Sequence, residues 1–223
     1  MNKPVPEPPQ SLIAPKWVAI SGILFSVLYI ISLVLLRLSA PADPADPGNW
    51  LTDPNFRNRV AVALNLVPFA GIAFLWFMAV LRNRIGSYED RLFATVFLGS
   101  GLLFVVLLFA AAAVSRGLLD VFADGHPAQS DAYRLGRSMA HSLMQTFAVR
   151  MEAVFMFVTS TIGLRTGVLS RWVSSIGFAC GTVLLLVITN FAWIALLFPL
   201  WVLVVSSYIL LLEFRSSRSR PNG

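Results

Sequence analysis

Residues 172–212 read WVSSIGFACGTVLLLVITNFAWIALLFPLWVLVVSSYILLL and contain no charged side chain. A helix rises about 1.5 Å per residue and the hydrocarbon core of a bilayer is about 30 Å thick, so one crossing needs about 20 residues. These 41 residues are too many for one crossing and enough for two. Asn190 favours a turn and Pro199 suits the first turn of a helix, which places two predicted helices at about 172–192 and 196–214.

The composition of the whole chain points to the same class of protein. Of the 223 residues, 57% are hydrophobic and 13% are charged, and the mean hydropathy is +0.75. Soluble domains average about 45–50% apolar and about 25% charged residues. This bias excludes a soluble enzyme and a disordered chain. The single cysteine, Cys180, excludes a disulfide scaffold.

Four further crossings are predicted, which makes an all-α bundle of six membrane-spanning helices in one domain, residues 16–214. Three are uncharged runs at 17–36, 60–81 and 92–114, the last extending outside the membrane to about residue 123. The fourth, at 138–164, is polar. The proline-rich residues 1–15 are predicted to be a disordered tail, and residues 215–223 a basic tail.

The distribution of lysine and arginine predicts that both termini are cytoplasmic. On this assignment ten basic residues lie inside and six outside, and the six outer ones are matched by six aspartates. The inner set is Lys3, Lys16, Arg82, Arg84, Arg91, Arg165, Arg171, Arg215, Arg218 and Arg220, and the outer set is Arg37, Arg57, Arg59, Arg116, Arg134 and Arg137.

The fourth crossing carries the polar and ionisable residues that are the main candidates for a functional site. Its apolar part, residues 153–164, is too short to cross a bilayer, so the helix must also include His141, Gln145, Arg150 and Glu152. At 100° per residue His141, Gln145 and Glu152 fall within about 60° of one line, and Arg150 falls on the opposite face. The polar faces must therefore turn toward other helices or water.

Two interpretations of this polar helix stay open. In the first, His141, Gln145 and Glu152 line a cavity open to the outer side, and the protein is a small transporter or channel. In the second, the protein is non-catalytic and acts through protein partners or lipid. Arg150 then binds carbonyls or Asn65 on the second helix, and Glu152 is protonated or bonded to a hydroxyl, as parts of a structural network.

Other candidate sites are weaker. Asp120, Asp124, His126 and Asp131 form an acidic outer cluster, whose oxygen atoms suit calcium or magnesium but whose spacing matches no EF-hand, so a solvated loop is favoured. No catalytic set, metal site or cofactor is predicted. The expected partner is the lipid bilayer and not nucleic acid, and a homo-oligomer or a protein partner stays open.

The loop Arg165-Thr166-Gly167-Val168-Leu169-Ser170-Arg171 resembles an R-x-G-x-L-x-R passage that joins two late transmembrane helices in small, uncharacterised bacterial multi-pass membrane proteins. The resemblance covers about 20 residues. It implies a protein of a bacterial cytoplasmic membrane and no assigned chemistry. Physically, the two arginines suit a membrane interface and Gly167 suits the turn between them.

Overall fold

The computed structural model describes residues 16–41, 43, 46, 48–85, 91–123, 130–186 and 193–218, and this part of the chain is helical without a strand. The predicted all-α class is therefore confirmed. The elements are α1 (Lys16–Ser39), η1 (Asn49–Thr52), α2 (Pro54–Ile85), α3 (Arg91–Ala123), α4 (Asp131–His141), η3 (Ser142–Ala148), α5 (Val149–Thr166), α6 (Arg171–Leu186), η4 (Ile194–Leu196) and α7 (Leu197–Arg218).

Five helices among the described residues are long and apolar enough to cross a membrane. They are α1, α2, α3, the continuous helix α4–η3–α5, and α7 together with η4. The 16 residues of α6 span about 24 Å, less than a full crossing. The predicted extension of this helix to residue 192 falls on residues 187–192, which lie outside the described part. The helices are consistent with a multi-pass membrane protein.

Several helix ends differ from the predicted ones because capping residues lie beyond the apolar runs. The second helix begins at Pro54, where the Asp53 side chain accepts the backbone N–H of Asn55 at 2.8 Å. The fourth begins seven residues early, capped by Ser130, whose hydroxyl accepts the backbone N–H of Tyr133 at 3.3 Å. The last helix continues to Arg218, so part of the predicted C-terminal tail is helical. Residues 1–15 lie outside the described part.

A cluster of five phenylalanines fills the centre of the bundle. Phe25, Phe74, Phe104, Phe155 and Phe198 come from α1, α2, α3, α5 and α7, and each is fully buried. Neighbouring ring centroids lie 4.9–6.3 Å apart, mostly in tilted or edge-to-face arrangements. Such pairs add to the stabilisation that burial of the rings supplies. We call these residues the phenylalanine cluster.

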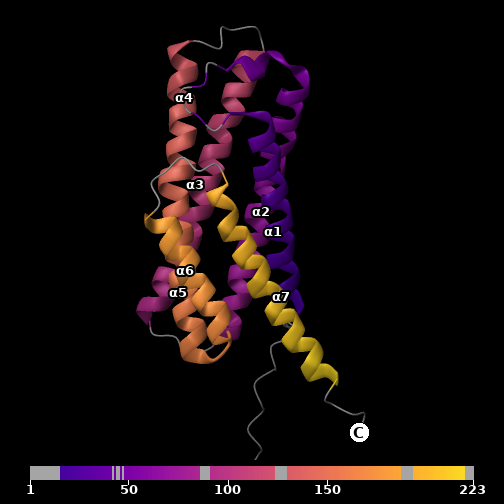
Figure 1. The fold of residues 1–223 in the computed structure, drawn as a ribbon, viewed down its shortest axis with the longest axis vertical. Helices are drawn as coiled ribbons and strands as arrows, with labels where there is room; N and C mark the ends of the chain where they lie inside the picture. The colour runs from indigo at the N-terminus through magenta and orange to yellow at the C-terminus, as the bar shows by residue number, and fades with distance from the viewer. Residues whose placement is uncertain are drawn as a thin grey trace, which may run out of the picture.

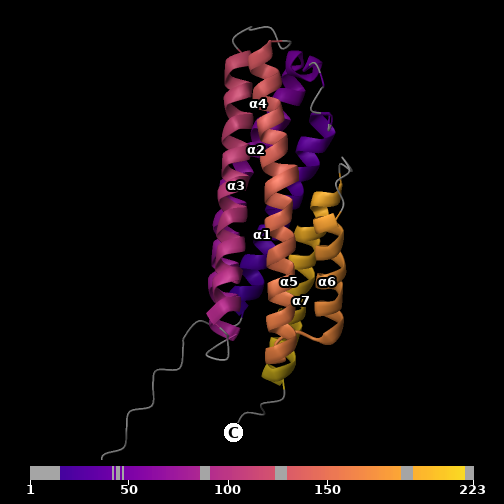
Figure 2. The same cartoon turned by 90° about the vertical axis from the view of Figure 1, so that its left-hand side faces the viewer.

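The helices α1, α2 and α3 run through both halves of the bundle, and the remaining helices differ between the halves. Figures 1 and 2 show α5, α6 and α7 beside one half, whereas α4 and η1 lie in the other. We call this second half the η1 end. In the half with α5, the glycines Gly177 and Gly181 let α6 lie close against α5. The phenylalanine cluster separates the interior of the two halves.

Candidate functional site

A cavity of about 160 Å³ lies inside the η1 end, between α1, η1, α2, α3 and the helix α4–η3. Apolar side chains of α2 and α3 form one side of it. The other walls carry most of the polar groups. The polar and aromatic lining residues are Tyr29, Ser32, Arg37, Trp50, Ser115, Tyr133, Arg137, His141 and Gln145.

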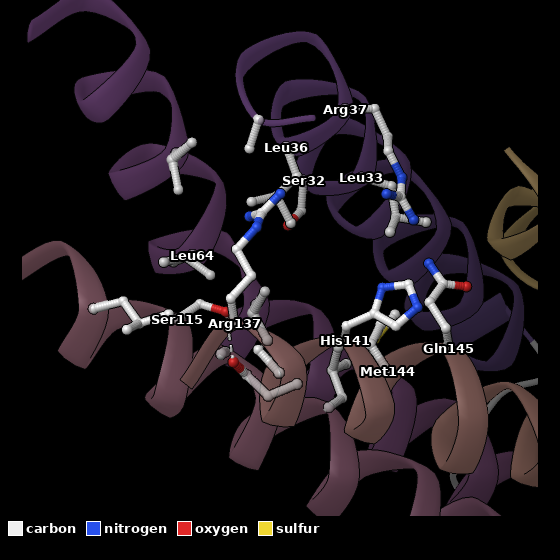
Figure 3. Close-up of a pocket in the computed structure, with 18 of the residues that line it drawn as sticks. Ser32, Leu33, Leu36, Arg37, Leu64, Ser115, Arg137, His141, Met144 and Gln145 are labelled. Carbon is white, nitrogen blue, oxygen red and sulfur yellow. Dashed lines mark hydrogen bonds between the residues drawn. The ribbon is translucent and has the colours of Figure 1, made fainter. Parts of the chain in front are cut away.

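One wall of the cavity is the polar stripe of the fourth helix. Arg137, His141 and Gln145 are spaced four residues apart and all line the cavity, with Met144 beside them. Figure 3 shows these side chains projecting from one helix toward Ser32, Leu33, Leu36 and Arg37 of α1. The structure therefore brings His141 and Gln145 together, as the helical spacing predicts.

The Arg137 side chain is held by the connection between α1 and η1. Its Nη2 group donates to the backbone carbonyl of Pro41 and, at 3.4 Å, to that of Asp43. The guanidinium carbon lies 5.9 Å from the centroid of the Trp50 ring, within the range of a cation–π interaction. The Nε group is buried and has no hydrogen-bond partner among the described residues. Part of its donor capacity is therefore unused.

Arg37 enters the cavity from the opposite wall, the last turn of α1. It is half-buried and forms no ion pair with a described residue. Its charge and that of Arg137 repel each other, and none of the described lining residues is acidic. Figure 3 shows the two guanidinium groups in the space between α1 and the fourth helix. The cavity is thus positively charged.

The floor of the cavity is a hydrogen bond between two buried side chains. The Tyr29 hydroxyl donates to Oε1 of Glu152 at 3.2 Å and contacts the sulfur of Met144 at 3.9 Å. Tyr29 is 1% and Glu152 0% exposed. Oε2 of Glu152 has no partner among the described residues. Glu152 therefore does not line the cavity but is one hydrogen bond away from it.

The phenylalanine cluster closes the interior beyond this floor. The Tyr29 ring stacks on Phe25 with centroids 5.4 Å apart, and meets Phe104 edge-on at 5.9 Å. No polar residue belongs to the cluster. The hydrogen-bonded floor of the cavity therefore lies directly against the apolar phenylalanine cluster.

Arg150 lies outside the cavity and binds its own helix. Its Nη1 group donates to the backbone carbonyls of Gln145 at 3.3 Å and Thr146 at 2.7 Å. Both carbonyls belong to η3, which is a π-helix, and such segments leave carbonyls displaced from the regular α-helical ladder. Arg150 does not pair with Glu152, in agreement with their expected separation on the helix. Asn65 is exposed on α2 and neither binds Arg150 nor lines this cavity.

The predicted acidic cluster is only partly described. Asp120 pairs with Arg116, one helical turn earlier, with 3.1 Å between its Oδ1 and the arginine Nε, and both side chains are exposed. Asp131 is exposed in the first turn of α4. Asp124 and His126 lie outside the described residues. Within the described part of the chain, no three His, Cys, Asp or Glu side chains gather in a way that could hold a metal ion.

Sequence reasoning missed the residues that face the fourth helix. Arg37 ends the first apolar run and was assigned only to the outer surface, while Tyr29 lies inside an uncharged run with nothing to distinguish it. Arg137 carried a signal, since it precedes His141 by one helical turn. Comparison of the chain with protein-family models, with curated proteins and with solved structures found no significant match.

Proposed function

We propose that the chain is a six-pass protein of a bacterial cytoplasmic membrane, with both termini inside and the η1 end outside, and that it transports a small solute. The solute enters the cavity at the η1 end from the outer side. The positive-inside rule supports this orientation, because the connections α2–α3 and α5–α6 and both terminal segments carry most of the basic residues.

The observation that carries the proposal is the position of Glu152 beneath the cavity. Ionisable groups within membrane helices are costly and usually serve function. Glu152 is fully buried, but its only described hydrogen bond is to Tyr29, which lines the cavity. A solute or proton that reaches Tyr29 therefore reaches the carboxyl group without crossing further protein. We therefore expect Glu152 to be the residue that responds to the arrival of a solute or a proton.

The elements around Glu152 supply the parts that a transporter needs. The phenylalanine cluster is the barrier toward the inner side, since its rings fill the space between five helices. The π-helix η3 lies next to Glu152, and π-segments are places where a helix changes its hydrogen-bond register. We propose that movement at η3 opens the barrier after the solute has bound.

The alternative is a protein that binds a ligand or partner at the cavity and transports nothing, with Arg150 and Glu152 structural. Two observations favour it. Arg150 is bonded to the carbonyls of its own helix, and the phenylalanine cluster is tightly packed. The two functions differ in one respect: only a transporter exposes residues beyond the cluster to the inner side.

Cysteine accessibility separates the two functions without knowledge of the solute. In a Cys180→Ser background, Ala140→Cys places a thiol in the cavity and Ile162→Cys places one beyond the cluster, about seven residues from Phe155. Phe147→Cys, at an exposed apolar position, is the lipid-facing control. An impermeant thiol reagent is applied to intact cells and to inverted membrane vesicles.

Transport predicts that Ala140→Cys reacts from outside and that Ile162→Cys reacts in inverted vesicles, while Phe147→Cys reacts in neither. A reactive Ala140→Cys with an unreactive Ile162→Cys supports the binding protein instead. If Ala140→Cys fails to react in intact cells, the cavity does not open outward and the proposal is wrong.

A further inference from the structure

We propose that the cavity is a binding site for an organic anion, whose charged head lies between Arg37 and Arg137 and whose apolar body extends toward Tyr29. This inference names the ligand class of the site described under the proposed function and rests on the same cavity. It does not require that the ligand be transported.

The charge of the cavity is the first reason. Arg37 and Arg137 approach from opposite walls, their charges repel, and neither pairs with a described acidic residue. Two like charges in a half-buried space destabilise a protein unless an anion lies between them, because solvent screens them less than at the surface. An anion bound there converts the repulsion into two charge-assisted interactions.

The unused donors of the cavity are the second reason. The Tyr133 hydroxyl belongs to a side chain only 1% exposed, and its oxygen faces the indole N–H of Trp50. Its own hydrogen has no acceptor among the described residues, and Nε of Arg137 has no partner there either. Both atoms carry hydrogen, and both residues line the cavity. Buried donors without partners are rare in folded proteins, and an anion offers acceptor oxygens for them.

The connection between α1 and η1 positions Arg137 through its backbone. The carbonyls of Pro41 and Asp43 both accept hydrogen bonds from Arg137. The Asp46 carboxylate accepts the backbone N–H of Gly48 at 3.0 Å and so fixes the conformation of this connection.

The part of the cavity between Arg37 and Tyr29 determines which ligand body can bind beside the charged head. Arg37 and Tyr29 are eight residues apart on α1, which is about 12 Å along the helix. Between these levels the lining is mainly apolar, with Leu33, Leu64 and Leu108 from three helices. A bare inorganic ion would leave this space unfilled. A carboxylate, sulfonate or phosphate ester with a small apolar body fills it and meets the arginines at the same time.

Binding of benzenesulfonate to the purified full-length protein tests the inference. This probe is charged at every pH of interest, and benzenesulfonamide is its neutral counterpart of nearly the same shape. Equilibrium dialysis in phosphatidylcholine nanodiscs measures both. We expect saturable binding of benzenesulfonate, and binding of benzenesulfonamide weaker by about 10-fold or more, because hydrogen bonds to charged groups are worth that much.

Two arginine variants and a matched control locate the site. Arg37→Gln and Arg137→Gln should each weaken benzenesulfonate binding by roughly 10- to 100-fold. Arg134→Gln is the control, because Arg134 is exposed on the same helix, three residues from Arg137, and does not line the cavity. Its binding should stay unchanged. Tyr133→Phe should weaken binding by a smaller factor, since it removes one neutral donor.

Further probes identify the source of the anion. Inorganic phosphate should compete poorly. If phosphatidylglycerol in the nanodisc displaces benzenesulfonate, a lipid headgroup is the occupant, and if it does not, a free organic anion is. The inference is overturned if benzenesulfonate and benzenesulfonamide bind alike, if Arg134→Gln loses as much affinity as Arg137→Gln, or if benzenesulfonate does not bind. None of these outcomes depends on transport, so a failed accessibility experiment leaves the binding result interpretable.

Discussion

The hydrogen bond between Tyr29 and Glu152 should contribute measurably to stability, and Tyr29→Phe tests this. The substitution keeps the ring in its place against Phe25 and removes only the hydroxyl that donates to Oε1 at 3.2 Å. Both oxygens of Glu152 would then lack a donor among the described residues. Leaving a buried group without its partner costs about 1–3 kcal/mol, so the free energy of unfolding should fall by that amount.

Tyr133→Phe is the matched control for this experiment. Tyr133 is as buried as Tyr29, but its hydroxyl oxygen faces the indole N–H of Trp50 and not a carboxyl group. Removing this hydroxyl leaves no carboxyl oxygen without its donor, so this variant should cost no more than about 1 kcal/mol and less than Tyr29→Phe. Unfolding in mixed micelles with increasing dodecyl sulfate, followed by circular dichroism, measures both variants.

A double-mutant cycle isolates the pair itself. Side-chain hydrogen bonds between membrane helices couple by about 0.6 kcal/mol on average and about 1.7 kcal/mol at most. Tyr29→Phe and Glu152→Leu should couple near the upper value, because both side chains are fully buried. The reasoning is refuted if Tyr29→Phe costs no more than Tyr133→Phe, or if the two substitutions are additive.

Five further substitutions, of which Gly99→Ala is a control, test other contacts by the same unfolding assay. Gly177→Ala should destabilise the protein by about 1–3 kcal/mol, because its Cβ would lie 2.1 Å from a side-chain oxygen of α5. Gly99→Ala, whose Cβ would meet nothing within 4 Å, should not destabilise it. Equal effects of the two substitutions would contradict this packing. Gly167→Ala should cost about 1–2 kcal/mol because φ is 71° there, and no loss would contradict the left-handed turn. Arg150→Ala should cost about 1 kcal/mol through the two carbonyls that it binds, and unchanged stability would show those bonds to be unimportant. Asn65→Leu should change stability by less than about 0.5 kcal/mol because Asn65 is exposed, and a large loss would show that Asn65 makes a stabilising contact.

The helical class and the positions of the long helices follow from the sequence because they depend on local properties. An uncharged run of about 20 residues is itself the signal for a crossing. The polar stripe through His141 and Gln145 is equally local, because residues four apart share a helix face. This stripe could therefore be predicted from the sequence without knowledge of the helix that faces it.

The residues that face this stripe could not be predicted from the sequence, because they depend on how the helices are oriented toward one another. In a soluble helix, the apolar face marks the core. In an apolar membrane helix, both the lipid-facing and the core-facing sides are apolar, so nothing in the sequence shows that Tyr29 turns inward and Asn65 outward. The π-helix η3 was missed for a related reason: its extra residue per turn shifts the register that a wheel of 100° per residue assumes.

The claim on which the function depends is that α4–η3–α5 crosses the membrane although it carries Arg150 and Glu152. Leu135 and Trp172 are 64% and 81% exposed, and they lie near the two ends of this helix, Trp172 just after the turn that follows it. In a Cys180→Ser background, Leu135→Cys and Trp172→Cys are each treated with an impermeant thiol reagent in intact cells. A true crossing predicts labelling at residue 135 at once and at residue 172 only after the membrane is opened. Labelling of both from the same side would place the helix outside the bilayer and contradict the account.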